Sequence, residues 1–465
     1  MATASEAFPT RRGIRALTAA ALAAAVCLSG ASTAAAQGVP VVRDAEIEAL
    51  VRDYARPIFK AAGLKAGVDI VLVNDQSFNA FVAGRRMFIN TGALLQADTP
   101  NEIIGVIAHE AGHIAGGHQD RLRQQLARAQ TMAIVGTLLG IGAVAAGAAT
   151  DNTEIGRAGM GVAAGSTEMA RRGILGYQRT EETTADRSAI KYLEATGQSA
   201  KGMIKTFQRF QSALSLSGAR VDPYQISHPT PQDRIANLEV LAHNSPNYDK
   251  VDPPGLQLRH DMMRVKIAIF TQGPNGLARL SRKGLDPTAV QYGQAIGAYL
   301  NGSPKAAIVK IDALIKQQPK NAYFHELRGD ALMKANRPKD AADAYARAVQ
   351  YDPARSGMLQ IALGQALLAV GQPASVQKAV TVLKQGLEKD KENAAGYQYL
   401  AQAYGQLGDV GEADLAIADQ NFYSGKYFDA QVFATRAQLK LKRGSPAWVR
   451  AQDIISYKPP RKKRG

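Results

Sequence analysis

Hydrophobic positions in the first 200 residues follow first a helical and then a strand period. Residues 45–62 carry apolar side chains at helical spacing. Short β-branched and aromatic runs predict strands at 68–73, 78–81 and 86–90, with a turn at Gly84. Further helices are predicted from Asn101 through His113 and over residues 180–195. The pattern indicates a small β-sheet among helices.

The pattern changes after Pro246 and the Pro253–Gly255 segment, which together indicate a linker. Beyond it the chain predicts helical hairpins. Pro319 and Pro353 are 34 residues apart, which is the period of a tetratricopeptide repeat. Small and aromatic residues such as Gly329 stand where the two helices of such a repeat touch. We therefore expect a mainly α fold with a small β-sheet (an α+β zincin-like protease domain) followed by an α-helical tetratricopeptide-repeat solenoid, with the number of repeats left open.

The first 36 residues have the pattern of a secretory signal peptide. Positive charge near Arg11 precedes an apolar stretch and a small-residue cleavage site at Ala34–Ala36. The only cysteine, Cys27, lies inside this segment, so a mature chain would contain no disulfide. The predicted organisation is a signal peptide at 1–36, a metallopeptidase domain at 37–250 and a repeat domain with a basic tail at 251–465.

Composition adds little to the choice of function. Of the 465 residues, 46% are hydrophobic, as in an ordinary soluble protein. The net charge of +16 would suit anionic lipid, nucleic acid or acidic proteins. No nucleic-acid motif accompanies the charge, so we expect no nucleic-acid partner. The tail Arg461–Arg464 is interpreted as a solvated end.

The segment HEAGH, residues 109–113, carries the chemistry. His109 and His113 are four residues apart, so both imidazoles lie on one helix face and can hold one Zn²⁺. Glu110 projects in an adjacent direction and can act as general base toward a water at the metal. The apolar flanks predict a buried helix, and burying these polar groups without a partner is costly. We predict one zinc ion per chain and a peptidase.

A catalytic zinc needs a third protein ligand. Gln119 stands where a metzincin would place a third histidine, which argues against that arrangement. Glu182 is the predicted ligand, because Asp186 follows one helical turn later and can accept the outer N–H of a zinc histidine. Glu181 is the competing ligand, although Asp186 would then be in poorer phase. Four other histidines are interpreted as structural or surface residues: His118, His243, His260 and His325.

These residues resemble a known family. HEAGH, with Glu182 through Asp186 about 70 residues later, is similar to the gluzincin metallopeptidases related to HtpX and the CAAX prenyl proteases. Asn79–Phe81 and Asn90–Gly92 resemble that family's strand segment. A signal peptide with C-terminal repeats is similar to its periplasmic, BepA-like branch. The resemblance implies a periplasmic endopeptidase that degrades misassembled outer-membrane proteins.

The segment HPTPQDRI from His228 is similar to the same branch. We hypothesise that His228 stabilises the tetrahedral oxyanion or swings onto zinc as a fourth ligand. A helix-capping loop histidine is the alternative. The segment Asn79, Ala80 and Phe81 could bind an extended substrate by strand addition if its strand forms a sheet edge. An ordinary covered strand is the alternative there.

Residues 133–149 are nearly uncharged but rich in Gly and Ala, and 17 residues are few for a membrane span. We expect a flexible apolar loop or a buried helical hairpin near the active site, and leave open whether it contacts lipid. Two functions are carried forward. One is a zinc endopeptidase whose repeats recruit substrate or assembly machinery. The other is an outer-membrane assembly chaperone with gated or little protease activity.

Overall fold

The computed structural model describes residues 40–64, 67–150, 152–217 and 232–459. Three parts of the sequence interpretation lie outside these ranges: the signal peptide at 1–36, His228 and the basic tail Arg461–Arg464. Residues Val41–Tyr457 form one unit by their internal contacts. The helices and strands predicted within that unit can therefore be compared with the structure directly.

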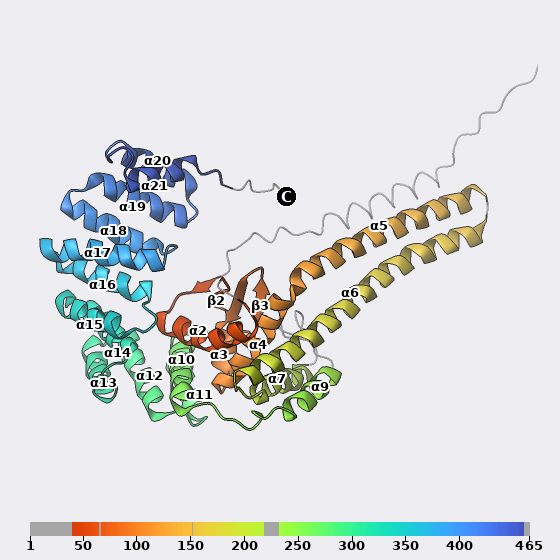
Figure 1. Cartoon of the computed structure of the whole chain (residues 1–465), viewed down its shortest axis with the longest axis horizontal. Coiled ribbons are helices and arrows are strands. Elements are labelled where there is room, and N and C mark those ends of the chain that lie inside the picture. Colours follow the sequence, from red (N-terminus) through yellow and green to blue (C-terminus); the bar gives the residue numbers. More distant parts are fainter. Residues whose placement is uncertain (1–39, 65–66, 151, 218–231, 460–465) are drawn as a thin grey trace, which may run out of the picture. The chain divides into compact units, whose positions relative to one another are not determined.

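A four-stranded sheet lies beside the first helices (Figure 1). Its strands are β1 (Val41–Val42), β2 (Asp69–Val73), β3 (Ala80–Ala83) and β4 (Arg86–Asn90). The order is β1-β2-β4-β3, with β2 parallel and β3 antiparallel to β4. Gly84, at φ +62°, makes the turn between β3 and β4 in the left-handed region that favours glycine. Three of these strands were predicted, although β3 begins at Ala80 rather than Phe78. β3 forms an edge of the sheet.

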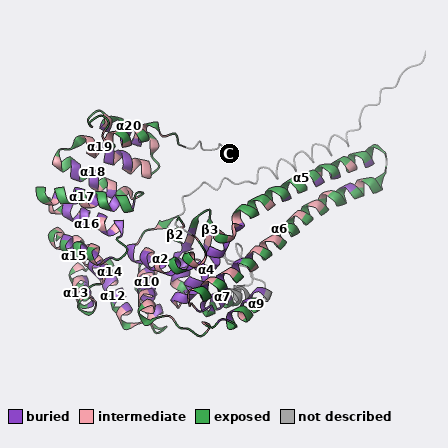
Figure 2. Ribbon diagram, in the orientation of Figure 1, coloured by how far each residue is buried: buried purple, intermediate pink, exposed green. Residues whose placement is uncertain are grey.

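The helices α2 (Ala45–Ala61), α3 (Thr91–Gln96) and α4 (Pro100–Gly116) pack around this sheet. Every residue of α4 from Pro100 to His113 is buried (Figure 2), both the apolar side chains spread around the helix and polar ones such as Glu102 and His109. Pro100 occupies the first turn, where its missing N–H costs nothing. Gly117, at φ +64°, ends the helix in a left-handed cap. The predicted helix from Asn101 through His113 is confirmed.

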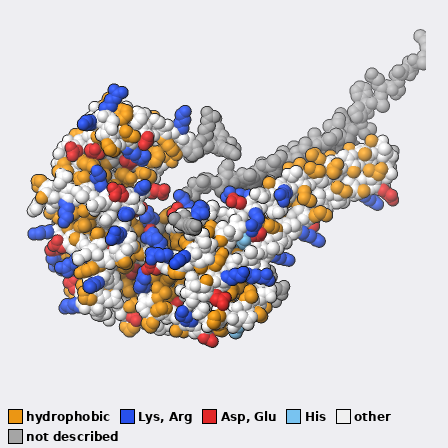
Figure 3. All heavy atoms as spheres, viewed as in Figure 1, with side chains coloured by type: hydrophobic (Ala, Val, Ile, Leu, Met, Phe, Trp, Pro, Cys, Tyr) orange, Lys and Arg blue, Asp and Glu red, His pale blue; other side chains and the backbone are white. Residues whose placement is uncertain are grey.

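Two long helices follow, α5 (His118–Ala149) and α6 (Thr153–Ala195), and they form an antiparallel hairpin (Figure 1). The interpretation of residues 133–149 as a loop is wrong, whereas the alternative of a helical hairpin is confirmed except that the hairpin is exposed rather than buried. The side chains of Leu138 and Leu139 are 63% and 65% exposed, and hydrophobic side chains line the hairpin (Figure 3). Glycine lowers helix propensity and so suggested a loop. Here Gly140 and Gly159 instead let the helices touch, since a Cβ on Gly140 would lie 2.6 Å from the carbonyl oxygen of Gly159.

The rest of the unit is helical. After α7 (Lys201–Ser217) and α9 (Gln232–His243) come α10 (Pro254–Gln272), α11 (Pro274–Ser281), α12 (Pro287–Leu300), α13 (Pro304–Gln317), α14 (Ala322–Lys334), α15 (Pro338–Tyr351), α16 (Gly357–Val370), α17 (Pro373–Lys389), α18 (Ala394–Leu407), α19 (Val410–Tyr423), α20 (Tyr427–Gln438) and α21 (Pro446–Ser456). From α12 onward, consecutive helices pack on each other. A Cβ on Gly329 would lie 2.6 Å from the Tyr345 ring, so this contact between α14 and α15 requires glycine. The predicted fold class is confirmed: mainly α with a small sheet, followed by helical repeats.

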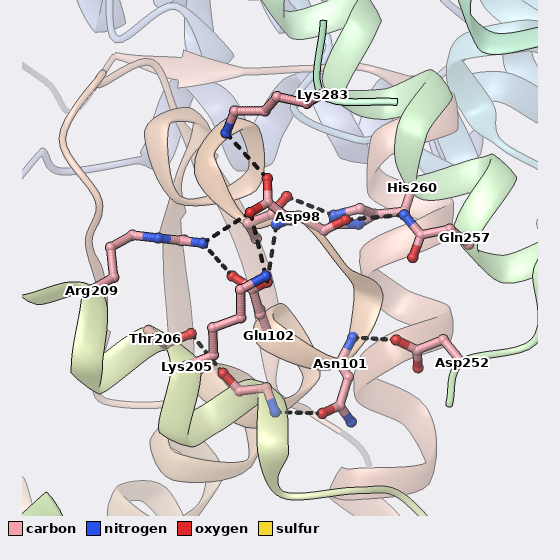
Figure 4. A network of polar contacts seen from close by, with 12 residues as sticks. Asp98, Asn101, Glu102, Lys205, Thr206, Arg209, Asp252, Gln257, His260 and Lys283 are labelled. Atoms are coloured by element: carbon pink, nitrogen blue, oxygen red, sulfur yellow. Dashed lines mark hydrogen bonds and ion pairs between the residues drawn. The ribbon is translucent and has the colours of Figure 1, made fainter. Parts of the chain in front are cut away.

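A polar network holds the N-terminal end of α4 (Figure 4). The fully buried carboxylate of Glu102 pairs with Lys205 and Arg209 on α7 at 2.9 and 2.7 Å. Asp98, just before α4, pairs with Arg264 on α10 at 2.7 Å. Burial raises the pKa of Asp98, but Arg264 and the neighbouring cations outweigh it and lower that pKa below its ordinary value. These ion pairs tie α4 to α7 and α10.

Candidate metal centre

Three side chains converge where α4 packs against α6. His109 and His113 lie one turn apart on α4, Glu182 reaches them from α6, and all three are buried. Nε2 of His109 lies 3.1 Å from Nε2 of His113. The two carboxylate oxygens of Glu182 lie 3.3 Å from the His109 nitrogen and 3.4 Å from the His113 nitrogen. The two imidazole nitrogens and the Glu182 carboxylate therefore face a common point.

The spacing of these donors fits a tetrahedral ion. With metal–ligand bonds of about 2.0–2.1 Å, two ligands of tetrahedral zinc lie about 3.3 Å apart. The two histidine nitrogens lie 3.1 Å apart, and they lie 3.3 and 3.4 Å from the two different oxygens of the Glu182 carboxylate. Two imidazole nitrogens that present lone pairs to each other at this distance repel unless a cation or a proton lies between them. Two imidazoles and one carboxylate are also a donor set that Zn²⁺ prefers, so the residues fit zinc.

The other nitrogen of His109 contacts Asp186. Nδ1 lies 2.9 Å from the Asp186 carboxylate, so Nδ1–H donates and Nε2 keeps its lone pair for the common point. Burial lowers the pKa of His109, but the bonds to Asp186 and Glu182 outweigh burial and raise that pKa to about 10. Without a metal ion the surrounding carboxylates therefore favour a second proton, on Nε2, which a zinc ion would displace to gain the lone pair.

His113 is oriented by a second chain of contacts. Its Nδ1 lies 2.9 Å from Nδ1 of His118, and Nε2 of His118 lies 2.7 Å from the Glu181 carboxylate. The negative charge of Glu181 favours the proton on Nε2 of His118, which leaves Nδ1 of His118 as the acceptor for Nδ1–H of His113. Nε2 of His113 then carries a lone pair, as Nε2 of His109 does. Glu181 points away from the common point toward His118 and Arg121.

Arg234, on α9, bridges the two acidic residues of α6. Its guanidinium lies 3.0 Å from Glu182 and donates to both oxygens of Asp186, at 2.5 and 2.9 Å. Burial raises the pKa of Asp186, but hydrogen bonds from His109 and Arg234 outweigh it and hold that pKa below its ordinary value. Asp186 therefore stays ionised at neutral pH. The bidentate contact also fixes both carboxylates in place.

Two residues between the histidines in sequence, Gly112 and Glu110, have different roles in the centre. Gly112 permits the close approach of α6, because a Cβ there would lie 3.0 Å from the carbonyl oxygen of Ala185. Glu110 is fully buried and lines a cavity of about 200 Å³ together with His113 and Glu182. Phe81 of β3 lines the same cavity. The Glu110 carboxylate, two of the convergent residues and a strand therefore meet at one small cavity.

The outer edge of β3 faces α5. The carbonyl of Asn79 accepts from N–H of Asn90 in β4, so by the alternation of an antiparallel ladder the polar backbone groups of Val82 and Gly84 point away from β4. The side-chain amide of Gln119 binds both: its Nε2 donates to the Val82 carbonyl, and its Oε1 accepts from Gly84 N–H at 2.9 Å. One side chain thus imitates the two hydrogen bonds of a neighbouring strand.

The structure brings together five of the predicted site residues: His109, Glu110, His113, Glu182 and Asp186. Of the predicted strand segment, Phe81 lines the cavity, while Asn79 is half-buried and Ala80 is buried. His228 lies outside the described residues. Sequence reasoning missed the positions of His118, Arg234 and Gln119. The short spacing from His113 to His118 was a usable signal, whereas the partners of Arg234 lie 48 and more residues away.

Comparison with known proteins assigns this region to a family. The profile of Peptidase family M48 matches residues 42–242. Residues 42–242 are an M48 peptidase domain. The M48 domain includes every residue of the centre described above, from His109 to Arg234. The M48 match supports a metallopeptidase.

Similarity extends beyond the M48 domain into the helical repeats. The beta-barrel assembly-enhancing protease of Escherichia coli (strain K12) is 24% identical over 419 residues, which covers 87% of this chain and 82% of that protein. A putative beta-barrel assembly-enhancing protease of Vibrio cholerae serotype O1 is 26% identical over 426 residues, covering 88% and 84%. The crystal structure of MamA matches 35% of this chain and 90% of its own, with 18% identity and a TM-score of 0.28.

Proposed function

We propose that the chain is a zinc-dependent endopeptidase with His109, His113 and Glu182 as the metal ligands. The observation that carries the proposal is the convergence of two buried imidazole nitrogens, 3.1 Å apart, on the buried carboxylate of Glu182, whose two oxygens lie 3.3 Å from one nitrogen and 3.4 Å from the other. The M48 match over residues 42–242 supports it independently. A zinc ion held by these three residues would supply Lewis-acid chemistry, polarising the scissile carbonyl and lowering the pKa of a water molecule.

Glu110 is the proposed general base. Its carboxylate takes a proton from the attacking water and returns it to the leaving amine. Burial at the floor of the cavity keeps bulk water away from the carboxylate, which strengthens its electrostatic interactions. Asp186 and His118 hold the two imidazoles in the tautomer that presents Nε2. Arg234 offsets the charge of the two buried carboxylates.

The substrate is proposed to be an extended segment of an unfolded or misassembled protein. Asn79, Ala80 and Phe81 belong to the edge strand and the turn before it, and Phe81 reaches the cavity. Strand addition at β3 would bind main chain through backbone hydrogen bonds, with little demand on sequence. The names of the relatives refer to β-barrel assembly, and we propose outer-membrane β-barrel proteins as the substrates. With the signal peptide predicted at 1–36, the proposed compartment is the periplasm.

The domain division at residue 250 is also part of the proposal. The M48 match ends at residue 242, and helical hairpins occupy the chain after residue 253. Helices α12 to α21 would act as the tetratricopeptide-repeat solenoid that recruits substrate or assembly machinery. For His228 we retain the two roles proposed from the sequence, stabiliser of the oxyanion or fourth ligand of zinc. An unchanged rate in His228→Ala would remove both.

A second function has one specific observation in its favour. Gln119 already binds the edge groups that a substrate strand would use, which favours a gated peptidase whose main work is assembly assistance through the repeats. The two functions differ in basal proteolysis. A peptidase degrades casein or an unfolded protein without further factors, whereas a gated assembly factor leaves them intact.

The deciding experiment compares Glu110→Gln with the parent protein in that assay. We expect the variant to keep its metal and to lose at least 100-fold in rate, since it loses the base alone. Glu154→Gln, an exposed residue at the start of α6, is the control. Metal analysis of Glu182→Ala against Glu181→Ala tests the ligand assignment. Metal loss in Glu181→Ala with full retention in Glu182→Ala would overturn it.

A further inference from the structure

The hairpin of α5 and α6 presents an apolar surface that the described chain leaves uncovered. No charged residue occurs on α5 from Ala129 to Ala149. α5 is long and apolar enough to cross a membrane, yet only 11% of its most apolar stretch is buried, so it is not a core helix. Its large exposed side chains are Met132, Ile134, Val135, Leu138, Leu139, Ile141 and Val144. They occupy every face of α5 except the one that packs against α6, where glycines such as Gly140 lie.

α6 divides into two flanks with different chemistry. Ile155, Val162 and Met169 are spaced by seven residues and therefore share one flank, where they are 40%, 48% and 65% exposed. Arg157 and Glu168, eleven residues apart, share the other flank. Both Arg171 and Arg172 turn toward Glu168, at 3.9 and 2.7 Å. One long side of the hairpin is thus apolar on both helices, while the other carries charge.

Basic residues border this apolar side at the end near the metal centre. They are Arg121, Arg123 and Arg128 on α5 and Arg171, Arg172 and Arg179 on α6. Figure 3 shows the basic side chains along the hairpin beside the hydrophobic ones. A helix with an apolar side, a charged flank and bordering arginines is the pattern of an interfacial helix that binds anionic lipid.

We propose that the hairpin lies flat in the surface of an anionic phospholipid bilayer, with the Ile155–Val162–Met169 flank of α6 toward the acyl chains. A protein partner would need a narrow stripe on α5, as in a coiled coil, whereas all exposed faces of α5 are apolar. Arg157 and Glu168 lie on the flank toward water in this orientation. The hairpin starts at His118, directly beside the metal centre, so lipid binding would hold the catalytic cavity close to the membrane surface.

The test is flotation of the full chain with vesicles of phosphatidylcholine alone or with 30% phosphatidylglycerol, a fraction chosen as on the order of that in anionic membranes. Carrying Glu110→Gln in every sample removes proteolysis without touching the hairpin, so failure of the peptidase proposal leaves this result interpretable. We expect binding to the anionic vesicles that falls with added salt. Met169→Glu should weaken it at least tenfold.

Met160→Glu is the matched control, because Met160 lies on the same helix and is 60% exposed, against 65% for Met169. The two methionines are nine residues apart, which places them on opposite flanks. We expect Met160→Glu to bind within about threefold of the parent, a difference of less than 1 kcal/mol. Equal losses in both variants would overturn the flat orientation. Binding of neither vesicle would overturn the lipid proposal, as would Met169-dependent self-association or unfolded-protein binding without lipid.

A second measurement does not depend on the stability of a charged variant. The chain contains one tryptophan, Trp448 on α21. With Trp448→Phe as background, Leu138→Trp should be quenched by brominated acyl chains in anionic vesicles. The parent Trp448 should not be quenched, because it lies outside the hairpin. Quenching of Trp448 and not of the tryptophan at position 138 would contradict the proposal.

Discussion

Nδ1 of His113 lies 2.9 Å from Nδ1 of His118, and only one of these nitrogens can carry the proton. The Glu181 carboxylate lies 2.7 Å from Nε2 on the opposite side of His118 and favours a proton there, so the proton between the two Nδ1 atoms belongs to His113. Burial lowers the pKa of His118, which keeps this ring neutral and able to accept. The orientation of one proposed ligand thus depends on a residue that does not touch the common point of the donors.

Replacing His118 should therefore weaken metal binding without removing a ligand. We expect His118→Ala to lower zinc affinity about 10- to 100-fold, the usual cost of losing an outer partner of a ligand histidine. His118→Asn, whose carbonyl can accept from Nδ1–H, should recover part of the loss. Chelator competition measures the affinity, and His243→Ala is the control on an exposed histidine of α9. Unchanged affinity in His118→Ala would show that the contact does not position His113.

The separation of α4 and α6 is a second determinant of the centre. Gly112→Ala would place a Cβ 3.0 Å from the carbonyl oxygen and 3.1 Å from Cα of Ala185, both backbone atoms. Because Glu182 lies on the same helix as Ala185, moving that helix outward by a few tenths of an ångström displaces the carboxylate. We expect weaker zinc binding and a loss of about 1–3 kcal/mol in unfolding free energy. Gly176→Ala, with open space at its Cβ position, should lose neither.

Gln119 offers a test of substrate binding at β3. If extended substrates add to this edge, they must displace the amide from Val82 and Gly84. Gln119→Ala removes the competitor, so KM for an unfolded substrate should fall by up to about tenfold, the equivalent of two modest hydrogen bonds. Gln124→Ala, an exposed residue one turn and a half further along α5, is the matched control. A higher KM in Gln119→Ala would mean that the amide supports the strand rather than blocks it.

The accuracy of the sequence predictions depended on how local the signal was. His109, His113 and Glu110 follow from helical spacing, and Asp186 follows from Glu182 by one turn of the same helix. The prediction for residues 133–149 was less accurate, because glycine has a low helix propensity and so indicated a loop. In this chain Gly140 instead permits the close contact between two long helices. The bidentate bond of Arg234 to Asp186 joins residues 48 positions apart and has no periodic signal. Contacts between residues so far apart in sequence can be identified only from the three-dimensional structure.

The last prediction concerns acid stability and a histidine outside the centre. His260 on α10 is fully buried, with Nε2–H donating to the Ala97 carbonyl and Nδ1 accepting from the Tyr54 hydroxyl, both at 3.0 Å. Burial, chiefly, lowers its pKa to about 3, so the folded chain keeps this ring neutral where the unfolded chain protonates it. Since the unfolded state binds the extra proton, the contribution of His260 is complete above about pH 6.5 and declines as the pH falls toward about 3.

The size of this effect can be stated for an accessible pH range. Protonation of the unfolded chain alone should cost about 2 kcal/mol of unfolding free energy between pH 7 and pH 5. His260→Gln removes the titrating group, so its unfolding free energy should depend less on pH by that amount, even if the variant is less stable at pH 7. Urea unfolding at both pH values measures the difference, with His243→Gln as the exposed control. Equal pH dependence in the parent and His260→Gln would contradict the assignment, because a ring that titrates normally when folded contributes no such slope.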